Sequence, residues 1–307
     1  MLIGGIEAGG TKIICGVADV KDGVVNIVQE ARFPTTTAEE AMPQLISYFQ
    51  KQPIEALGIA SFGPLDLKKT SKTYGHITTT PKEGWQNADW IHPLEEALHI
   101  PVALDTDVNG AALGEARYGA GKGLDVVTYM TVGTGIGVGV YVEGHLLHGM
   151  MHPEAGHMRV ERYPSDFYTG HCPFHQDAFG TGGCLEGYAS GPAIEVRWGK
   201  KGEALQDRDE VWEMESFYLA QGVANLILCY APDKIIIGGG VMHQRNLFPM
   251  IREKVQKQLH QYVKTSELVE GIDTYIVPPT LGDHAGLMGA VELGRLVAGS
   301  QCPVARK

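Results

Sequence analysis

One pattern is written twice along this chain, and it constrains the fold more than any other feature. Each half begins with three apolar segments joined by tight turns and continues with alternating helix-type and strand-type segments. The first two segments are "LIGGIEA" and "KIICGVAD" in the first half, and "DVVTYMTVG" and "IGVGVYVEG" in the second. A repeat of this kind predicts two α/β lobes of the same topology, with ligands bound in a cleft between them.

The repeat also gives the expected boundaries. We expect a first lobe over residues 1–118 and a second over residues 119–284, with a C-terminal helix at about 285–307 that packs back on the first lobe. An irregular insertion at about 152–188 interrupts the second lobe. The segment "AEEAMPQLISYFQ" has helical spacing, and Pro43 is expected in its first turn because proline disrupts a helix interior. The segments "HLLHGM" and "DTYIVPP" are expected as strands of the second lobe.

The composition indicates an ordinary globular protein. Of its 307 residues, 44% are hydrophobic and 20% are charged, as in chains that bury a sizeable core. The formal net charge of −11 argues against nucleic acid or an anionic membrane as a partner, since both bind basic surfaces. The N-terminus has no signal-peptide pattern, and the apolar run near "VANLILCYA" is shorter than the roughly 20 residues of a membrane span. We therefore expect a cytoplasmic location.

The five cysteines do not suggest a disulfide scaffold, because their number is odd and the chain is long. Cys15 and Cys229 lie in apolar segments and are expected in the core, whereas Cys302 belongs to the polar C-terminal tail. Trp85 and Trp90 are expected either in the core or at a subunit contact.

Two glycine turns lie at equivalent points of the repeat, one in "EAGGTK" and one in "TVGTGIG". Glycine permits tight hairpins, and a turn without side chains also lets amide groups approach an anion closely. Because the same turn occurs twice, we favour phosphate binding. The sequence contains no G-x-x-x-x-G-K-[ST] motif, and "VGTGIGVGV" lacks the G-x-G-x-x-G spacing, so neither a P-loop nor a dinucleotide-binding motif is indicated.

A carboxylate follows a predicted strand in "DTDVNGAAL", where Asp107 begins a predicted helix. The positive end of the helix should keep this carboxylate ionised at neutral pH, so it could accept a proton from a hydroxyl group. A simple helix cap is the competing interpretation, since Asp is a favoured N-cap residue. Asp105 is expected to be structural.

Five segments together resemble the ROK sugar kinases, in the order in which that family uses them: "GGIEAGGTK", "TDVNGAALGE", "TVGTGIGVG", "HPEAGH" and "IIIGGGV". The segments "ASFGPLD", "YGHITTTPKEGW" and "CLEGYASGPAIE" are similar to the fructokinase branch. The resemblance covers nearly the whole chain. It implies a duplicated actin-like, ribonuclease-H-like fold and ATP-dependent phosphorylation of a hexose at its 6-hydroxyl group. The similarity to the fructokinase branch implies D-fructose as the substrate and fructose 6-phosphate as the product.

The resemblance also implies roles for matching residues. Asp107 corresponds to the general base. Sugar contacts are implied for Asn109, Glu154, His157 and Glu186. Nucleotide contacts are implied for Gly9, Gly10, Thr11, Lys12, Thr131, Gly133, Thr134, Gly135, Pro192, Gly238, Gly239 and Gly240. The family usually has Asp where this chain has Glu7, which puts direct Mg²⁺ ligation there in doubt and leaves contact through a water.

The insertion contains His157, Cys172, His175 and Cys184. Two Cys and two His are a usual tetrahedral zinc set, although the residues alone are equally consistent with an incidental loop. The resemblance implies a structural Zn²⁺ here. In the fructokinase pattern the last Cys follows the second His closely, whereas here "QDAFGTGG" separates them. This longer spacing could displace Cys184, with His152 or His171 as substitutes.

Three other functions are compatible with the sequence. Another ROK hexose kinase would act on glucose, mannose or an amino sugar. A sugar-responsive ROK transcriptional regulator would carry a helix-turn-helix domain before the first strand, and here that strand is expected to begin at Leu2. A non-catalytic actin-like ATPase would not need the sugar-side residues. The resemblance further implies ATP with Mg²⁺, a sugar substrate and a homodimer.

Overall fold

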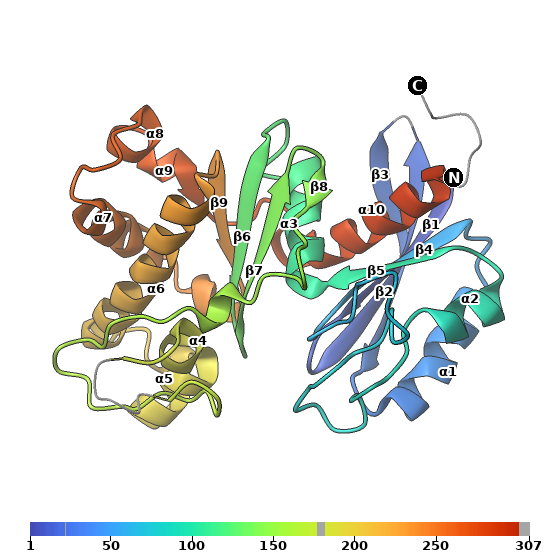
Figure 1. Ribbon diagram of the computed structural model, residues 1–307, viewed down its shortest axis with the longest axis horizontal. Coiled ribbons are helices and arrows are strands. Elements are labelled where there is room, and N and C mark those ends of the chain that lie inside the picture. Colours follow the sequence, from blue (N-terminus) through green and yellow to red (C-terminus); the bar gives the residue numbers. More distant parts are fainter. Residues whose placement is uncertain (22, 177–181, 301–307) are drawn as a thin grey trace. The chain divides into compact units, whose positions relative to one another are not determined.

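The computed structural model describes residues 1–21, 23–176 and 182–300. They divide into two compact units. The first unit contains Met1–Gly119, Leu146–His152 and the chain from Asp283 onward. The second contains Ala120–His145 and Pro153–Gly282. Figure 1 shows that each unit is built on its own sheet.

The sheet of the first unit has five strands in the order β3-β2-β1-β4-β5. Their bounds are β1 Leu2–Ala8, β2 Lys12–Lys21, β3 Val24–Pro34, β4 Ala56–Ser61 and β5 Val102–Thr106. Strands β1, β2 and β3 form an antiparallel meander, whereas β4 and β5 run parallel to β1. The turn between β1 and β2 is the first glycine turn.

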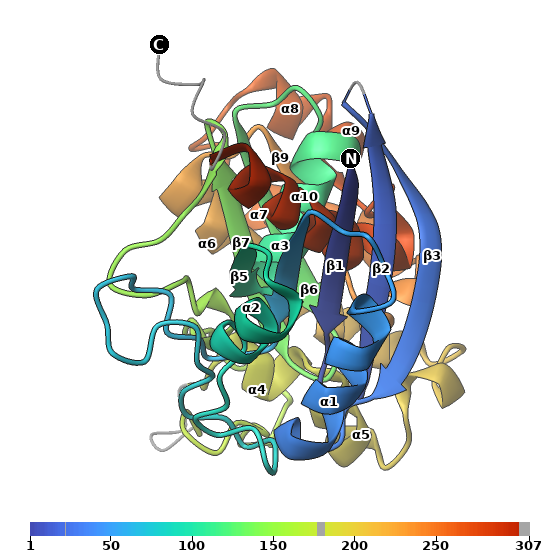
Figure 2. The same cartoon turned by 90° about the vertical axis from the view of Figure 1, so that its right-hand side faces the viewer.

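Successive side chains of a strand point to opposite faces of the sheet. Helices cover both faces of this sheet, so β1 contributes side chains to two cores. Ile6 of β1 belongs to a core with α1 (Ala38–Phe49) and α2 (His92–Leu98). Ile3 belongs to a second core with Val291 of α10 (Ala285–Ser300). Figure 2 shows α1 and α10 against the strands of this unit. Trp85 and Trp90 are fully buried and stacked, with ring centroids 5.1 Å apart, so they are core residues.

Glycines let α3 (Asp107–Tyr118) pack closely against α10 within the first unit. A Cβ atom at Gly289 would lie 1.7 Å from the carbonyl oxygen of Gly110. A Cβ atom at Gly114 would lie 2.4 Å from the carbonyl oxygen of Ala285. These glycines weaken the intrinsic helix preference of α3, but the close packing requires them.

The sheet of the second unit repeats the order of the first, as β8-β7-β6-β9-β10. Its strands are β6 Val126–Val132, β7 Ile136–Val142, β8 His145–Leu146, β9 Lys234–Gly238 and β10 Ile276–Val277. Strands β6 and β7 are antiparallel and joined by the second glycine turn, and β9 runs parallel to β6. The sequence repeat is therefore a repeat of strand order, and β6, β7 and β9 also repeat the strand directions of the first sheet.

Six α-helices of the second unit are described. They are α4 Leu185–Ala189, α5 Gly191–Trp198, α6 Asp209–Tyr230, α7 Leu247–Leu259, α8 Ser266–Val269 and α9 Ile272–Tyr275. Helix α6 packs against α7 and against α4. Most of its side chains are buried, so this long helix is part of the core of the unit. Short 3₁₀ helices lie at η1 (Ala155–His157), η2 (Gly202–Ala204) and η3 (Gly240–His243), and η4 (Gly282–His284) precedes α10.

Four local predictions were wrong. Pro43 lies in the second turn of α1, not the first, because the buried stripe of Ala41, Leu45 and Phe49 holds the helix on the sheet. The expected strand over 273–279 is mostly α9, and β10 has only two residues before Pro278 and Pro279, which cannot donate ladder hydrogen bonds. The expected third strand of the second unit is only His145–Leu146.

Cys229 was the fourth error, since it is exposed on α6 whereas Cys15 is buried as expected. Neighbouring Leu228 is also 56% exposed, so this side of the helix end faces outward although its sequence is apolar. Cys302 lies outside the described residues. Within the described part of the chain, no helix is long and apolar enough to cross a membrane.

Candidate active site and metal centre

The first glycine turn lies at the end of β1, where Gly10, Thr11 and Lys12 are exposed. The backbone N–H of Gly9 donates to the carbonyl of Lys12 at 2.9 Å, and the Thr35 hydroxyl donates to the carbonyl of Gly9 at 2.7 Å. A Cβ atom at Gly10 would meet nothing within 4 Å. Packing within the described chain therefore does not require glycine at this position.

Asp107 is the first residue of α3, directly after β5. Thr106 is the N-cap, and its hydroxyl accepts from the backbone N–H of Asn109 at 3.2 Å. The Asp107 side chain accepts from the N–H of Val108 at 2.8 Å through Oδ1. Burial raises the pKa of Asp107 above its ordinary value, although hydrogen bonds from backbone N–H groups oppose the shift. The cap is thus made by Thr106, and Asp107 keeps Oδ2 for other chemistry.

Glu7 lies on the same unit, at the end of β1 before the glycine turn. Burial, with a smaller effect from the Asp107 carboxylate, raises its pKa to about 7, although Lys12 opposes the shift. Its Oε2 atom is buried without a hydrogen-bond partner among the described residues. A Cβ atom at Gly286 would lie 2.6 Å from the Glu7 carboxyl carbon, so glycine at the start of α10 makes room for this longer side chain.

Asp105 and Asn109 form a hydrogen-bonded cluster with His148. Nδ2 of Asn109 donates to Oδ1 of Asp105 at 2.7 Å, and Nε2 of His148 lies 2.9 Å from Oδ2 of Asp105. The N–H of Thr106 also donates to Oδ1 of Asp105, at 2.8 Å. Asp105 therefore holds the side-chain amide of Asn109, a predicted sugar-binding residue. No motif pointed to the partner, His148.

The second glycine turn is fixed within the second unit by two neighbours. The N–H of Gly191 donates to the carbonyl of Gly133 at 2.7 Å, which joins the turn to the start of α5. Oε2 of Glu186 accepts from the N–H of Ile136 at 2.9 Å. A Cβ atom at Gly135 would lie 2.7 Å from that carboxylate oxygen. Thr131 is the last but one residue of β6, beside the turn, and Thr134 at the tip of the turn is exposed.

The segment after β9 approaches the same turn. A Cβ atom at Gly133 would lie 3.9 Å from the backbone nitrogen of Gly240. Gly239 has φ +94, and a Cβ atom there would lie 2.4 Å from the carbonyl oxygen of Val132. Pro192 occupies the first turn of α5. The second unit thus brings together its predicted nucleotide-side residues, from Thr131–Gly135, the start of α5 and Gly238–Gly240.

The predicted sugar-side segment of the second unit packs directly on β7. A Cβ atom at Gly156 would lie 1.6 Å from the carbonyl oxygen of Ile136, so only glycine fits. Glu154 is the N-cap residue of η1, and His157 ends it. Nδ1 of His157 lies 3.9 Å from Oε1 of Glu186. Glu186 is therefore close to both the glycine turn and His157.

The four predicted zinc ligands form one cluster. One ligand atom from each of His157, Cys172, His175 and Cys184 lies within 4.8 Å of every other. Sγ of Cys172 lies 3.5 Å from Nδ1 of His175 and 3.9 Å from Nδ1 of His157. Ligands of one tetrahedral zinc are separated by about 3.6 Å, as bonds of about 2.0–2.3 Å require. The donor set and its spacing both fit Zn²⁺.

The longer loop does not displace Cys184, although residues 177–181 lie outside the described chain. Neither His171 nor His152 is in the cluster. Instead, Nε2 of His152 accepts from the N–H of Leu65 at 3.2 Å in the first unit.

A second anchor of the insertion was not predicted. Nε of Arg197 lies 3.0 Å from Oδ2 of Asp166, and both side chains are buried. The hydroxyl of Tyr218 donates to the same Asp166 oxygen at 2.7 Å, and the Arg197 guanidinium lies 4.8 Å from the ring centre of Tyr168. Glu215 is also buried, and burial raises its pKa well above the ordinary value. This network ties the insertion to α5 and α6 independently of the cysteines.

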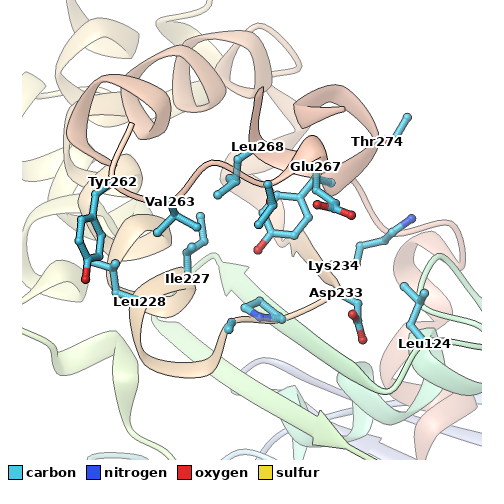
Figure 3. Close-up of a pocket in the computed structure, with 14 residues that line it drawn as sticks. Leu124, Ile227, Leu228, Asp233, Lys234, Tyr262, Val263, Glu267, Leu268 and Thr274 are labelled. Atoms are coloured by element: carbon cyan, nitrogen blue, oxygen red, sulfur yellow. The ribbon is translucent and has the colours of Figure 1, made fainter. Parts of the chain in front are cut away.

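The second unit also contains a pocket of about 610 Å³. Figure 3 shows residues that line it. Its lining includes Ile227 and Leu268 and, at the start of β9, Asp233 and Lys234. The glycines Gly238–Gly240 follow the opposite end of β9. This pocket is therefore separate from the predicted nucleotide residues.

Comparison with known proteins identifies the family. A protein described as a putative fructokinase from Bacillus subtilis is 50% identical over 292 residues, which cover 95% of each chain. A fructokinase from Pediococcus pentosaceus is 44% identical over 96% of this chain and 98% of its own. The crystal structure of a ROK hexokinase from Thermus thermophilus matches with a TM-score of 0.78 and 27% identity, over 98% of this chain and 100% of its own. Residues 3–296 match the sequence model of the ROK family, and the chain belongs to that family.

Proposed function

We propose that the protein is a fructokinase, which transfers the γ-phosphoryl group of ATP to the 6-hydroxyl group of D-fructose. The observation that carries this proposal is identity of 44% and 50%, over nearly the full chain, to proteins described as fructokinases. The fold supports it through the match to a ROK hexokinase. The actin-like relationship implied by the resemblance agrees with two units of the same strand order.

Asp107 is proposed as the general base. As the 6-hydroxyl oxygen attacks the γ-phosphorus, the Asp107 carboxylate accepts its proton, and the bond from the γ-phosphorus to the bridging oxygen breaks to release ADP. The raised pKa of Asp107 makes the carboxylate a stronger proton acceptor than an ordinary aspartate. Thr106 supports this role, because it caps α3 and leaves Oδ2 of Asp107 available.

The remaining residues are proposed to bind the two substrates. Asn109, Glu154, His157 and Glu186 would contact sugar hydroxyl groups, for which amides and carboxylates offer paired donors and acceptors. Since Nδ1 of His157 faces the cysteines, Nε2 is the nitrogen left for the sugar. The amide groups of Gly9–Lys12 and Thr131–Gly135 would bind phosphate oxygens. Pro192 and Gly238–Gly240 would contact the adenosine.

Two metal ions belong to the proposal. Magnesium bound with ATP would neutralise charge on the phosphates, and Glu7 would contact it through a water. The unpartnered Oε2 of Glu7, with Asp107 and Asp283 among the charges that shift its pKa, is a carboxylate environment suited to this hard cation. Zinc held by His157, Cys172, His175 and Cys184 would be structural, because it fixes the insertion that carries Glu154 and Glu186.

A substrate panel tests the proposal. ATP consumption would be measured with D-fructose, D-glucose, D-mannose and N-acetyl-D-glucosamine, and the product position determined by NMR. The highest kcat/KM for D-fructose, with phosphate on the 6-oxygen, is expected. A higher value for another sugar would favour a different ROK hexose kinase, and no sugar-dependent ATP consumption would contradict the kinase assignment.

A cytoplasmic homodimer is part of the same proposal, because the resemblance implies it. Each chain has a mass of 33.2 kDa. Light scattering at the assay concentration should give twice that mass, and the mass of a single chain would contradict the dimer.

A further inference from the structure

His148 reaches the first unit through a short crossing segment. The segment Leu146–His152 belongs to the first unit, whereas the residues on both sides of it belong to the second. His148 and Asp105 are joined there by the 2.9 Å contact between Nε2 and Oδ2. The hydrogen bond with Asp105 raises the pKa of His148, which favours the protonated ring.

The donors and acceptors of this cluster fix the orientation of the Asn109 amide. Asp105 is 3% exposed and faces His148 and two amide donors, and a carboxylate accepts hydrogen bonds from such donors. The group of Asn109 that faces Asp105 must therefore be the NH₂ group. Nε2 of His148 must likewise carry a hydrogen. The 3.4 Å contact between Nδ2 of Asn109 and Nε2 of His148 is then a contact between two donors, each bonded to a different oxygen of the Asp105 carboxylate.

This orientation leaves one polar atom without a partner. Asn109 is fully buried, and its Oδ1 has no hydrogen-bond partner among the described residues. A buried acceptor left unsatisfied is destabilising, and native proteins retain few of them. The backbone of Asn109 is also held in place. It lies in the first turn of α3, and its N–H donates to the hydroxyl of the N-cap residue Thr106. Oδ1 is thus a fixed acceptor that lacks a donor.

We propose that Asp105 and His148 are positioning residues, which hold the Asn109 amide so that Oδ1 accepts a hydrogen bond from a hydroxyl group of the sugar substrate. This inference rests on the proposed kinase function and adds two residues to it. Without His148, the Asp105 carboxylate loses a donor and can draw the Asn109 amide out of position. Without Asp105, either Oδ1 or the NH₂ group of the Asn109 amide can point to the sugar.

Kinetics of single variants test the first consequence. His148→Ala should raise KM for D-fructose about 10-fold, as expected for one misplaced hydrogen bond, while KM for ATP stays unchanged. His148→Gln should restore most of the loss, because its amide NH₂ can donate to Oδ2 of Asp105. His92→Ala is the matched control. It breaks another His–Asp pair of the same unit, with Nδ1 2.8 Å from Oδ2 of Asp89, and should change neither KM.

A double-mutant cycle separates positioning from a general structural effect. Asn109→Ala should raise KM for D-fructose, and adding His148→Ala to it should cause little further rise, because both changes remove the same contact. Independent, multiplicative effects would overturn the proposal, as would an unchanged KM for D-fructose in an active His148→Ala enzyme. If His148→Ala does not fold, the cycle pairs Asp105→Asn with Asn109→Ala, because Asp105→Asn also releases the Asn109 amide. Absence of sugar phosphorylation by the wild-type chain would instead contradict the kinase function itself.

Discussion

Nδ1 of His157 lies 3.7 Å from Sγ of Cys184, although the two residues are 27 positions apart in the sequence. The same nitrogen lies 3.9 Å from Sγ of Cys172. These separations are close to those between ligands of one zinc ion. The longer loop before Cys184 is thus accommodated without loss of the donor cluster.

Replacing one ligand should remove the metal. In Cys184→Ser the hydroxyl can still accept from the N–H of Gly187, which Sγ accepts at 3.3 Å, but it is a poor zinc ligand. The zinc content, measured by mass spectrometry, should fall from about one ion per chain to near zero, with Tm lower by roughly 5–10 °C. Cys229→Ser, at an exposed cysteine, is the control. Equal zinc in both variants would contradict the site.

Close packing of α10 predicts a large loss of stability in Gly289→Ala. The added Cβ would lie 1.7 Å from the carbonyl oxygen of Gly110, so the helices must separate. The free energy of unfolding, from urea titration, should fall by about 2–4 kcal/mol. Gly299→Ala in the same helix meets nothing within 4 Å and should be neutral or slightly stabilising. Similar stabilities for both variants would show that the helices are not in this contact.

Several features of this fold follow from local patterns. The repeat predicted two sheets because strand and helix periodicities are local properties, and the resemblance located the four zinc-site residues. A helix was predicted over α3 despite its glycines. The need for glycine there comes from close contact with α10, which is far away in the sequence, so local patterns could not explain it.

Other features depend on tertiary contacts that a sequence does not display. The segment around His148 was expected as a strand, but it leaves the second unit after β8 and bonds to Asp105. Proline is expected only in the first turn of a helix, yet Pro43 lies in the second turn of α1. Burial of Leu45 and Phe49 outweighs the backbone hydrogen bond that proline cannot make. The Arg197–Asp166 pair joins α5 to the insertion, and neither residue belongs to a motif.

The first glycine turn predicts a selective effect on nucleotide binding. Gly10→Ala adds a methyl group where the described chain leaves open space, so Tm should change by about 1–2 °C or less. If phosphate approaches this backbone, KM for ATP should rise by about 10-fold or more, with little change in KM for the sugar. Gly149→Ala, also in open space, is the control. An unchanged KM for ATP would remove Gly10 from the phosphate site.

Glu7 predicts a pH dependence of stability in the protein without nucleotide or metal. Its pKa is raised from 4.5 to about 7, mainly by burial. Between these values the folded chain binds more protons at Glu7 than the unfolded chain does. The contribution of Glu7 to the free energy of unfolding is therefore most favourable below about pH 4.5 and is lost as pH rises to about 7.

In Glu7→Gln this loss is absent, so the variant should gain stability relative to wild type as pH rises. The difference should reach on the order of 2–3 kcal/mol by pH 8, measured by urea titration at several pH values. Glu39→Gln, at an exposed position of α1, should follow the wild-type profile. A constant difference between Glu7→Gln and wild type across pH 4–8 would mean that Glu7 titrates normally.

The most direct measurement is kcat for D-fructose phosphorylation by Asp107→Asn. Asparagine keeps the shape and the acceptor for the N–H of Val108, so the fold and both KM values should be nearly unchanged, but it cannot take a proton. We predict that kcat falls by about 10²–10⁴-fold. Asp89→Asn, which alters another carboxylate that accepts from backbone N–H groups at a helix start, should keep kcat near wild type. A kcat for Asp107→Asn within a few-fold of wild type would contradict the role of Asp107 as the base.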